Sequence, residues 1–240
     1  MTSPKQRALI TGASSGIGKA TALAFAKAGI DLVLVSRSPD KLDLVTTAAL
    51  EAGVEAKAYA LDLAEIKQVK AGIGAISQDF AAIDILVNSA GIAYTNPLSD
   101  TQLSDWQQVI DLNLTSVFQC IAGILPVMRD QKRGTIINIA SIAGQQAFPN
   151  WGAYSVSKAG LIALSKTLTA EERHHGIRVV TVCPGAVDTP LWDTDTVRVD
   201  LNRSAMLSPE IVAQLILQTA LLPEQAVVEL VTLMPSAGVL

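Results

Sequence analysis

Short apolar runs alternate with longer amphipathic segments along this chain. The runs have the length and the β-branched residues of strands that are buried on both faces of a sheet. They predict strands at residues 7–11, 31–36, 57–61, 83–88, 135–141, 177–183 and 228–233. The segments between them repeat apolar residues with helical spacing. They predict helices at residues 16–28, 39–52, 66–80, 104–129, 152–175 and 209–221.

Strands that alternate with helices predict an α/β fold. The expected architecture is a single-domain, doubly wound parallel sheet of about seven strands with helices on both faces. Ser104 with Asp105 is the expected start of the fourth helix, and Gly29, Gly53 and Gly176 are expected stops. No linker or repeat divides residues 1–240, and we expect the long irregular segment 188–208 to be a substrate-binding lid.

A glycine-rich loop follows the first predicted strand, at the edge of the sheet where α/β proteins bind ligands. Its glycines allow a tight turn and a close approach of backbone to phosphate, and the helix that follows offers free N–H groups. We expect a dinucleotide pyrophosphate here. The expected contacts are Gly12, Ser14, Ser15, Gly16, Ile17 and Gly18. The alternative is an ordinary tight turn.

The end of the second predicted strand indicates which dinucleotide binds. An acidic residue there would bind both ribose hydroxyls of NAD. This chain has Arg37 instead, with Asp31 at the wrong end of the strand and Asp40 in the following helix. An arginine can pair with the 2′-phosphate of NADP, which a carboxylate would repel. We therefore expect NADPH to be preferred over NADH; the alternative is that Arg37 is merely solvated.

Two further strand ends carry candidate cofactor contacts. Asp62 follows the third strand, where its carboxylate could accept a hydrogen bond from the adenine amino group or cap the helix near Ile66. Asn88, Ala90 and Gly91 follow the fourth strand. Their small size would let the backbone pass close to the cofactor, although a plain turn is the alternative.

Tyr154 and Lys158 share one face of a predicted helix. A free phenol has a pKa of about 10, and a neighbouring ammonium would lower this pKa towards neutrality. Ser141 ends the fifth strand, where its hydroxyl could hold a carbonyl oxygen while the phenol supplies a proton. A tyrosine and a lysine at this spacing also occur by chance on exposed helices.

Composition restricts the possible functions. The 240 residues are 50% hydrophobic and 17% charged, as in a globular protein, and the net charge of −4 argues against a nucleic-acid-binding role. We find no signal peptide and no apolar run of about 20 residues, so no membrane role is expected. Cys120 and Cys183 fit no metal motif. No metal site is therefore predicted, and buried thiols favour the cytoplasm.

The order of these motifs resembles the short-chain dehydrogenase/reductase family, from residue 11 to about residue 209. The resemblance rests on residues 11–18 and 88–91, Asn113, Ser141, Tyr154 with Lys158, and Pro184 with Gly185. It implies a Rossmann-type fold. It also implies that Tyr154 is the general acid/base, that Lys158 binds the nicotinamide ribose and lowers the pKa of the tyrosine, and that Ser141 orients the substrate carbonyl.

The resemblance assigns two more regions. Asn113 corresponds to the family asparagine that helps to hold a water in a proton relay with Lys158; the alternative is a core amide bonded to neighbouring backbone. Residues 184–189 are similar to the family turn that contacts the nicotinamide amide. The implied cofactor contacts there are Pro184, Gly185, Val187 and Thr189, in addition to Tyr154 and Lys158.

The chain departs from the family pattern in two places. Ser89 replaces the second asparagine of the usual Asn-Asn-Ala-Gly motif, and we expect altered local bonding without loss of activity. Members resembling 3-oxoacyl-[acyl-carrier-protein] reductases usually end in a glycine-rich segment, whereas this chain ends in an apolar tail, residues 228–240. The resemblance implies a homodimer or homotetramer that pairs through helices 104–129 and 152–175. The apolar tail is a possible further interface.

Together these features predict an NADP(H)-dependent oxidoreductase that transfers a hydride between nicotinamide and a carbonyl or secondary alcohol. The alternatives are an epimerase or dehydratase of the same fold and a nucleotide-sensing protein without turnover. The expected substrate pocket is of mixed apolar and polar character. Its candidate residues are Gln145, Gln146, Phe148, Trp151, Trp192, Val197, Leu201 and Met206.

Overall fold

The computed structural model describes residues 5–80, 82–199 and 202–238. Its centre is a seven-stranded parallel sheet in the order β3-β2-β1-β4-β5-β6-β7. The strands are β1 (Arg7–Thr11), β2 (Asp31–Ser36), β3 (Ala56–Ala60), β4 (Ile85–Asn88), β5 (Gly134–Ile139), β6 (Ile177–Pro184) and β7 (Leu230–Leu233). This confirms the predicted sheet, and the strand ends shift by at most two residues.

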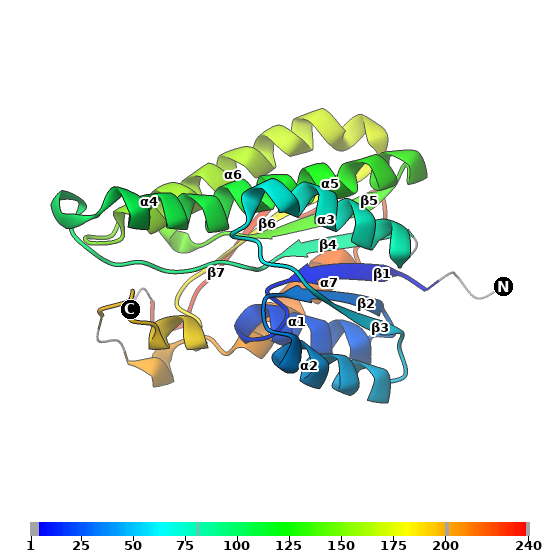
Figure 1. Cartoon of the computed structure of the whole chain (residues 1–240), viewed down its shortest axis with the longest axis horizontal. Helices are drawn as coiled ribbons and strands as arrows, with labels where there is room; N and C mark the ends of the chain where they lie inside the picture. Colours follow the sequence, from blue (N-terminus) through cyan, green and yellow to red (C-terminus); the bar gives the residue numbers. More distant parts are fainter. Residues whose placement is uncertain (1–4, 81, 200–201, 239–240) are drawn as a thin grey trace.

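Helices cover both faces of the sheet (Figure 1). The helices are α1 (Gly16–Lys27), α2 (Pro39–Glu51), α3 (Ile66–Asp79), α4 (Leu103–Ile110), α5 (Ser116–Gln131), α6 (Gly152–Glu172) and α7 (Pro209–Ala220). One core lies between the sheet and α1, α2 and α7, with Phe25, Leu42 and Ile216 fully buried. The other lies between the sheet and α3, α5 and α6, around Ile73 and Ile124. Strands buried between two helical layers explain the apolar runs of the sequence.

The fourth predicted helix is interrupted. Residues 104–129 were expected to form one helix, but α4 and α5 are joined by a π-helical turn, Asp111–Thr115. The wider turn inserts one extra residue per hydrogen bond, which the apolar spacing of the sequence does not reveal. Helix α4 begins at Leu103 after Gln102, so the expected cap at Ser104 is wrong. The three predicted glycine stops do lie just beyond the ends of their helices.

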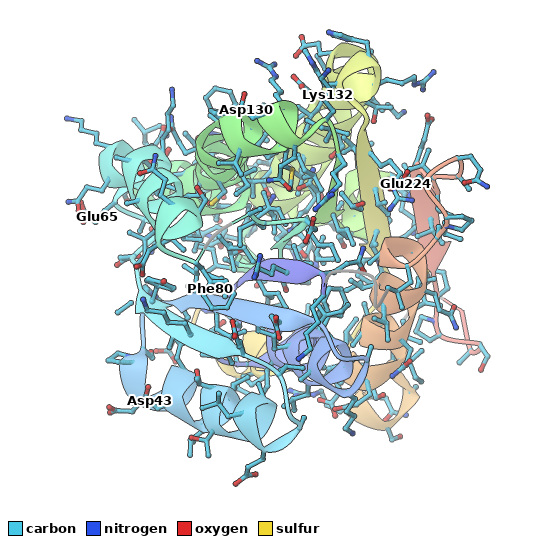
Figure 2. All side chains as sticks on the ribbon, turned by 90° about the vertical axis from the view of Figure 1, so that its right-hand side faces the viewer. Asp43, Glu65, Phe80, Asp130, Lys132 and Glu224 are labelled. Carbon is cyan, nitrogen blue, oxygen red and sulfur yellow. The ribbon has the colours of Figure 1, made fainter. Side chains whose placement is uncertain are left out.

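The helical stretch Leu103–Gln131 has the length and hydropathy of a membrane span, contrary to the expectation from sequence. Its inner side packs against the sheet, where Ile121, Ile124 and Met128 are buried. A core helix of an α/β domain passes the same test of length and composition. Charged side chains such as Asp43, Glu65 and Asp130 point outward from the helices and turns (Figure 2).

Candidate active site

The strand order reverses between β1 and β4, and ligands of α/β proteins bind at such a switch point. The loop after β1 fits a pyrophosphate closely. Gly12 has φ +66°, and a Cβ atom there would lie 2.8 Å from Cα of Ala90; a Cβ atom at Gly18 would overlap the Gly12 carbonyl oxygen. Ser15 precedes α1 without capping it through its side chain, so the first N–H groups of the helix point to this crevice. The residues present therefore fit a dinucleotide phosphate.

Hydroxyl groups surround the end of β2. The Ser36 hydroxyl donates to Ser14 Oγ at 2.9 Å and accepts from the Ser38 N–H at 3.2 Å. Arg37 between them is exposed, and its guanidinium has no ion pair among the described residues. The sequence analysis missed Ser36 and Ser38; the serines on both sides of Arg37 were the available signal. The Ser14 hydroxyl, which keeps its own hydrogen, and the Arg37 guanidinium could bind a phosphate.

Asp62 follows β3 as expected, but it does not cap α3. Its Oδ1 accepts from the Ala64 N–H at 2.9 Å, and α3 begins after Glu65. The helix-cap alternative is therefore wrong, because Asp62 closes the turn that precedes the helix. One carboxylate oxygen remains available for a ligand.

The loop after β4 is held from both sides. Asn88 donates to Asn138 Oδ1 at 2.8 Å, and Asn138 donates to Ser165 Oγ in α6 at 2.9 Å. On the other side, the N–H groups of Ser89 and Ala90 donate to Thr11 Oγ1 at 3.1 and 3.3 Å. The altered position, Ser89, keeps its loop conformation through its backbone, and its side chain lines the cavity described below.

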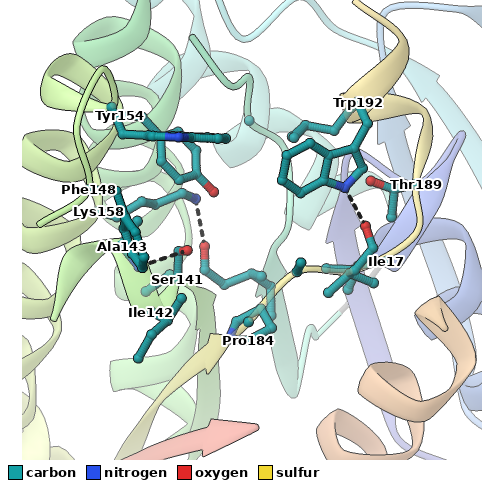
Figure 3. A pocket seen from close by; sticks show the side chains of 18 of the residues that line it. Ile17, Ser141, Ile142, Ala143, Phe148, Tyr154, Lys158, Pro184, Thr189 and Trp192 are labelled. Carbon is teal, nitrogen blue, oxygen red and sulfur yellow. Dashed lines mark hydrogen bonds between the residues drawn. The ribbon is translucent and has the colours of Figure 1, made fainter. Parts of the chain in front are cut away.

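Ser141, Tyr154 and Lys158 converge on one cavity (Figure 3). Ser141 follows β5, where its Oγ accepts from the Ala143 N–H at 3.1 Å, which leaves its own hydrogen free to donate. Lys158 is buried and donates from Nζ to the Ile139 carbonyl oxygen at 2.8 Å; Nζ lies 5.7 Å from the centre of the Tyr154 ring. A hydroxyl, a phenol and an ammonium thus face the same point from β5 and α6.

The pKa of the phenol differs from the expectation. Burial raises the pKa of Tyr154 to about 12, and the hydrogen bond with Ser141 opposes this only in part. Burial also lowers the pKa of Lys158 to about 8. The expected lowering of the tyrosine pKa by Lys158 is therefore not found, because desolvation is the largest cause of both shifts in this apolar site.

Asn113 lies in the π-helical turn and is fully buried. Its amide donates to the Ile92 carbonyl oxygen at 2.9 Å and to Ser157 Oγ at 3.1 Å, and it accepts from the Ile92 N–H at 2.8 Å. These are the contacts of a core amide bonded to nearby backbone. Gly91 lies between Asn113 and Lys158: a Cβ atom there would be 3.0 Å from Asn113 Oδ1 and 3.7 Å from Lys158 Nζ. The absence of a side chain at Gly91 leaves these two groups facing each other.

The cavity has a volume of about 290 Å³. Its lining includes Ile17, a predicted contact of the pyrophosphate, and Pro184, Gly185, Val187 and Thr189, the predicted contacts of the nicotinamide. The rest of the lining is formed mainly by large apolar side chains. They are Ile142, Phe148, Trp151, Leu191, Trp192, Val199 and Met234.

The expected mixture of apolar and polar residues in the pocket is wrong in part. Gln145 points away and bonds with Thr232 Oγ1 at 2.9 Å, and Gln146, Val197 and Met206 are not among the lining residues described. Leu201 lies outside the described residues. Met234 was missed, because only the pairing of β7 with β6 brings the tail beside Gly185, whose N–H donates to the Leu233 carbonyl oxygen at 2.8 Å.

Part of the segment 188–208 lines this pocket, through Thr189, Leu191, Trp192 and Val199. Its ends pair, with the Asp188 N–H bonded to the Leu207 carbonyl oxygen at 2.8 Å. Arg203 forms ion pairs with Asp188 and Asp193, and donates to the Thr189 carbonyl oxygen at 3.2 Å. Residues 200 and 201 of this segment lie outside the described residues. Across the described ranges, no cluster of three or more His, Cys, Asp or Glu side chains could hold a metal ion.

Comparison with known proteins agrees with this architecture. Residues 6–198 match the family described as short chain dehydrogenase. The chain belongs to this family. A 3-oxoacyl-[acyl-carrier-protein] reductase from Synechocystis sp. is 42% identical over 189 residues, which cover 78% of this chain and 76% of the relative. The 3-oxoacyl-[acyl-carrier-protein] reductase FabG of Thermotoga maritima is 36% identical over 217 residues, 87% of each chain.

Solved structures of short-chain dehydrogenases superimpose over almost the whole chain. An alcohol dehydrogenase from Thermococcus sibiricus, complexed with 5-hydroxy-NADP, has a TM-score of 0.89 at 27% identity and covers 97% of both chains. A metagenomic short-chain oxidoreductase in complex with NADP has a TM-score of 0.84 at 31% identity, covering 96% of this chain and 97% of the other. This short-chain dehydrogenase is therefore an enzyme of the oxidoreductase class with a Rossmann-type fold.

Proposed function

We propose that this short-chain dehydrogenase is an NADP(H)-dependent oxidoreductase acting on a carbonyl group or the corresponding secondary alcohol. The observation that carries the proposal is the convergence of Ser141, Tyr154 and Lys158 on a cavity continuous with the nucleotide loop. An epimerase, a dehydratase or a nucleotide-sensing protein would also bind a nucleotide, but none of these is specifically favoured by the geometry.

The bound cofactor supplies or accepts the hydride. Ser141 donates a hydrogen bond to the carbonyl oxygen of the substrate. Tyr154 donates its proton to the same oxygen as the hydride reaches the carbon, so a carbonyl, a hydride and a proton yield an alcohol. Lys158 holds a second proton beside the phenol, and Asn113 fixes the loop at Ile92 and Gly91 that faces this ammonium.

The pKa of Tyr154 is suited to the reducing direction. A pKa of about 12 keeps the phenol protonated at neutral pH, ready to donate. The reverse reaction needs a phenolate, which this apolar site disfavours. The proposed proton donor is therefore in the protonated form that carbonyl reduction needs near pH 7.

The preference for NADPH rests on the end of β2. Arg37 presents a positive charge without an ion pair among the described residues, and the Ser14 hydroxyl, which accepts from Ser36, keeps its own hydrogen for a ligand. The two structural relatives above were solved with NADP or a derivative of it, which is consistent with this preference.

Further properties belong to the same proposal. We place the protein in the cytoplasm, where its free, buried cysteines stay reduced. It acts as a single domain in a homodimer or homotetramer, with 188–208 covering the substrate. Exposed apolar side chains on α5 and α6, Phe118 and Val156, support pairing through these helices.

The decisive experiment compares the wild type with a Tyr154→Phe variant during NADPH oxidation in the presence of a panel of carbonyl compounds. We expect the variant to lose about 10²–10⁴-fold in kcat, because the proton donor is removed, while NADPH still binds. Near wild-type turnover would refute the role of Tyr154. No turnover by the wild type on any carbonyl compound would refute the proposed reaction and favour a sensing role.

A further inference from the structure

Aromatic side chains form one wall of the cavity beside Tyr154. Trp151 lies edge-on to Tyr154 with ring centres 5.3 Å apart, and Trp192 lies edge-on to Trp151 with ring centres 5.8 Å apart. Phe148 and Leu191 extend this wall. A substrate group beside the reacting carbonyl would therefore contact aromatic and aliphatic carbon (Figure 3).

We propose that this pocket selects uncharged ketones and aldehydes with an apolar, preferably aromatic, substituent, and that it discriminates against oxo acids whose carboxylate adjoins the carbonyl. The inference rests on the proposed function and specifies its substrate class. Trp192 is the main specificity-determining residue.

The polar atom of Trp192 is already bonded. Its Nε1–H donates to the Val187 carbonyl oxygen at 2.7 Å, which fixes the ring and leaves its carbon surface to the cavity. An indole with a satisfied N–H offers a substrate dispersion and apolar contact, but no hydrogen bond.

The segment that carries Trp192 is tied down at several points. Thr196 is bonded to the strand-like segment after β4: the Thr95 N–H donates to the Thr196 carbonyl oxygen at 2.8 Å, and Thr196 Oγ1 donates to the Ala93 carbonyl oxygen at 2.8 Å. The ion pair of Arg203 with Asp193 fixes the residue next to Trp192. The wall is thus positioned before substrate arrives, which reduces the ordering cost of binding.

The lining of the cavity offers little to an anion. Among the described lining residues, Lys158 is the basic side chain, and its Nζ is bonded to the Ile139 carbonyl oxygen behind the phenol. Beside Trp192, the Asp193 carboxylate is paired with Arg203, which also binds Asp188, while Asp195 and Arg198 are exposed outside the lining. Gln145, which could have bonded a carboxylate, bonds Thr232 instead. A carboxylate on this side would lose its hydration without gaining a partner.

The test uses two substrates that differ in charge at one position, methyl benzoylformate and the benzoylformate anion. With wild-type enzyme and NADPH, we expect kcat/KM for the ester to exceed that for the anion by about 100-fold, the factor that corresponds to loss of a few kcal/mol of hydration. Equal values, or preference for the anion, would overturn the inference while leaving the proposed reaction intact.

Three variants test which residues determine the selectivity. Trp192→Ala should lower kcat/KM for the ester by about 10-fold or more, whereas Trp192→Phe, which keeps an aromatic face, should retain most of it. Val199→Lys adds a cation at the exposed rim and should lower the ester-to-anion ratio of kcat/KM several-fold. An unchanged ester-to-anion ratio in both Trp192→Ala and Val199→Lys would contradict the assignment.

A binding measurement covers the case in which neither substrate is turned over. Calorimetric titration of the wild-type protein in the presence of NADP⁺ should show binding of the ester with a negative heat-capacity change, as expected for apolar burial, and weaker binding of the anion. Tighter binding of the anion would overturn the inference independently of catalysis.

Discussion

At the scale of single residues, burial determines how the site is charged. Tyr154 and Lys158 are close enough to attract one another, yet the apolar surroundings shift both pKa values towards the neutral forms, to about 12 and about 8. The spacing of the two residues in the sequence indicates their proximity. It contains no information about desolvation, which depends on what surrounds them.

The buried Lys158 predicts a pH-dependent stability. Between its folded pKa of about 8 and its unfolded value of 10.5, the unfolded chain binds the additional proton, so the free energy of unfolding should rise with pH in this window. The contribution of one such group is at most about 1.4 kcal/mol per pH unit. Urea unfolding of the wild type and a Lys158→Met variant from pH 7.5 to 9.5 checks this.

The variant should be more stable than the wild type at pH 7.5, and the difference should shrink as the pH rises. Tyr154→Phe serves as the control, because the tyrosine titrates above this window. Parallel stability curves for wild type and Lys158→Met would contradict the shifted pKa.

Arg37 predicts a selective effect on cofactor affinity. Arg37→Ala should weaken NADPH binding by about 10- to 100-fold, as for loss of a charge-assisted phosphate contact, and should leave NADH binding nearly unchanged. Fluorescence titration with both cofactors measures this. Arg37→Lys is the matched control: it keeps the charge without the planar fork, so an intermediate loss is expected. Equal losses of affinity for NADPH and NADH would show that Arg37 does not bind the 2′-phosphate.

At the scale of elements, the ends of α5 and α6 are joined by an ion pair between an exposed arginine and a buried glutamate. Arg129 binds the Glu172 carboxylate through two nitrogens, with Nε donating to Oε2 at 2.8 Å. Glu172 is fully buried, and Arg129 is the first cause of its lowered pKa. A buried carboxylate destabilises the folded state when its positively charged partner is removed.

We therefore predict that Arg129→Met lowers the melting temperature by about 5 °C at pH 7, a shift typical of a lost charged contact in a chain of this size. Because the pKa of Glu172 is lowered in the folded state, the pair stabilises above the unfolded pKa of about 4.3 and this contribution is lost as the pH falls further. Differential scanning calorimetry at pH 7 and at pH 3.5 tests both statements.

The double variant Arg129→Met/Glu172→Met is the control for packing. It should recover much of the stability at pH 7, since it leaves no unpaired buried charge. If the double variant is no more stable than Arg129→Met, the loss of stability in Arg129→Met comes from altered packing and not from an unpaired charge.

The π-helical turn between α4 and α5 is a structural feature that the sequence pattern did not predict. The apolar pattern of residues 104–129 is continuous, and it predicted the helix but not the turn. Asn113 is the one residue in this stretch that signalled a departure, because a buried amide must be bonded. Which partners satisfy it, Ile92 and Ser157, depends on the loop after β4 and on α6.

At the scale of the whole molecule, the outer surfaces of α5 and α6 predict the assembly. Phe118 and Val156 are 49% and 48% exposed, and they lie on the two helices through which the family resemblance implies pairing. We expect a homodimer or homotetramer by light scattering, and a shift to a smaller species for Phe118→Glu. Leu44→Glu on α2, where Leu44 is 72% exposed, is the matched control and should not change the mass. A monomeric wild type would remove this interface.

By itself, the sequence determined the strands and helices, the nucleotide loop and the positions of Ser141, Tyr154 and Lys158, because periodicity and turn chemistry act between neighbouring residues. Only the tertiary structure decided the contact of Ser36 with Ser14, the turn of Gln145 towards Thr232 and the entry of Met234 into the pocket. These contacts join residues far apart in the chain. The apolar character of the pocket and the direction of both pKa shifts have the same origin, since desolvation is a property of all the segments that enclose a site.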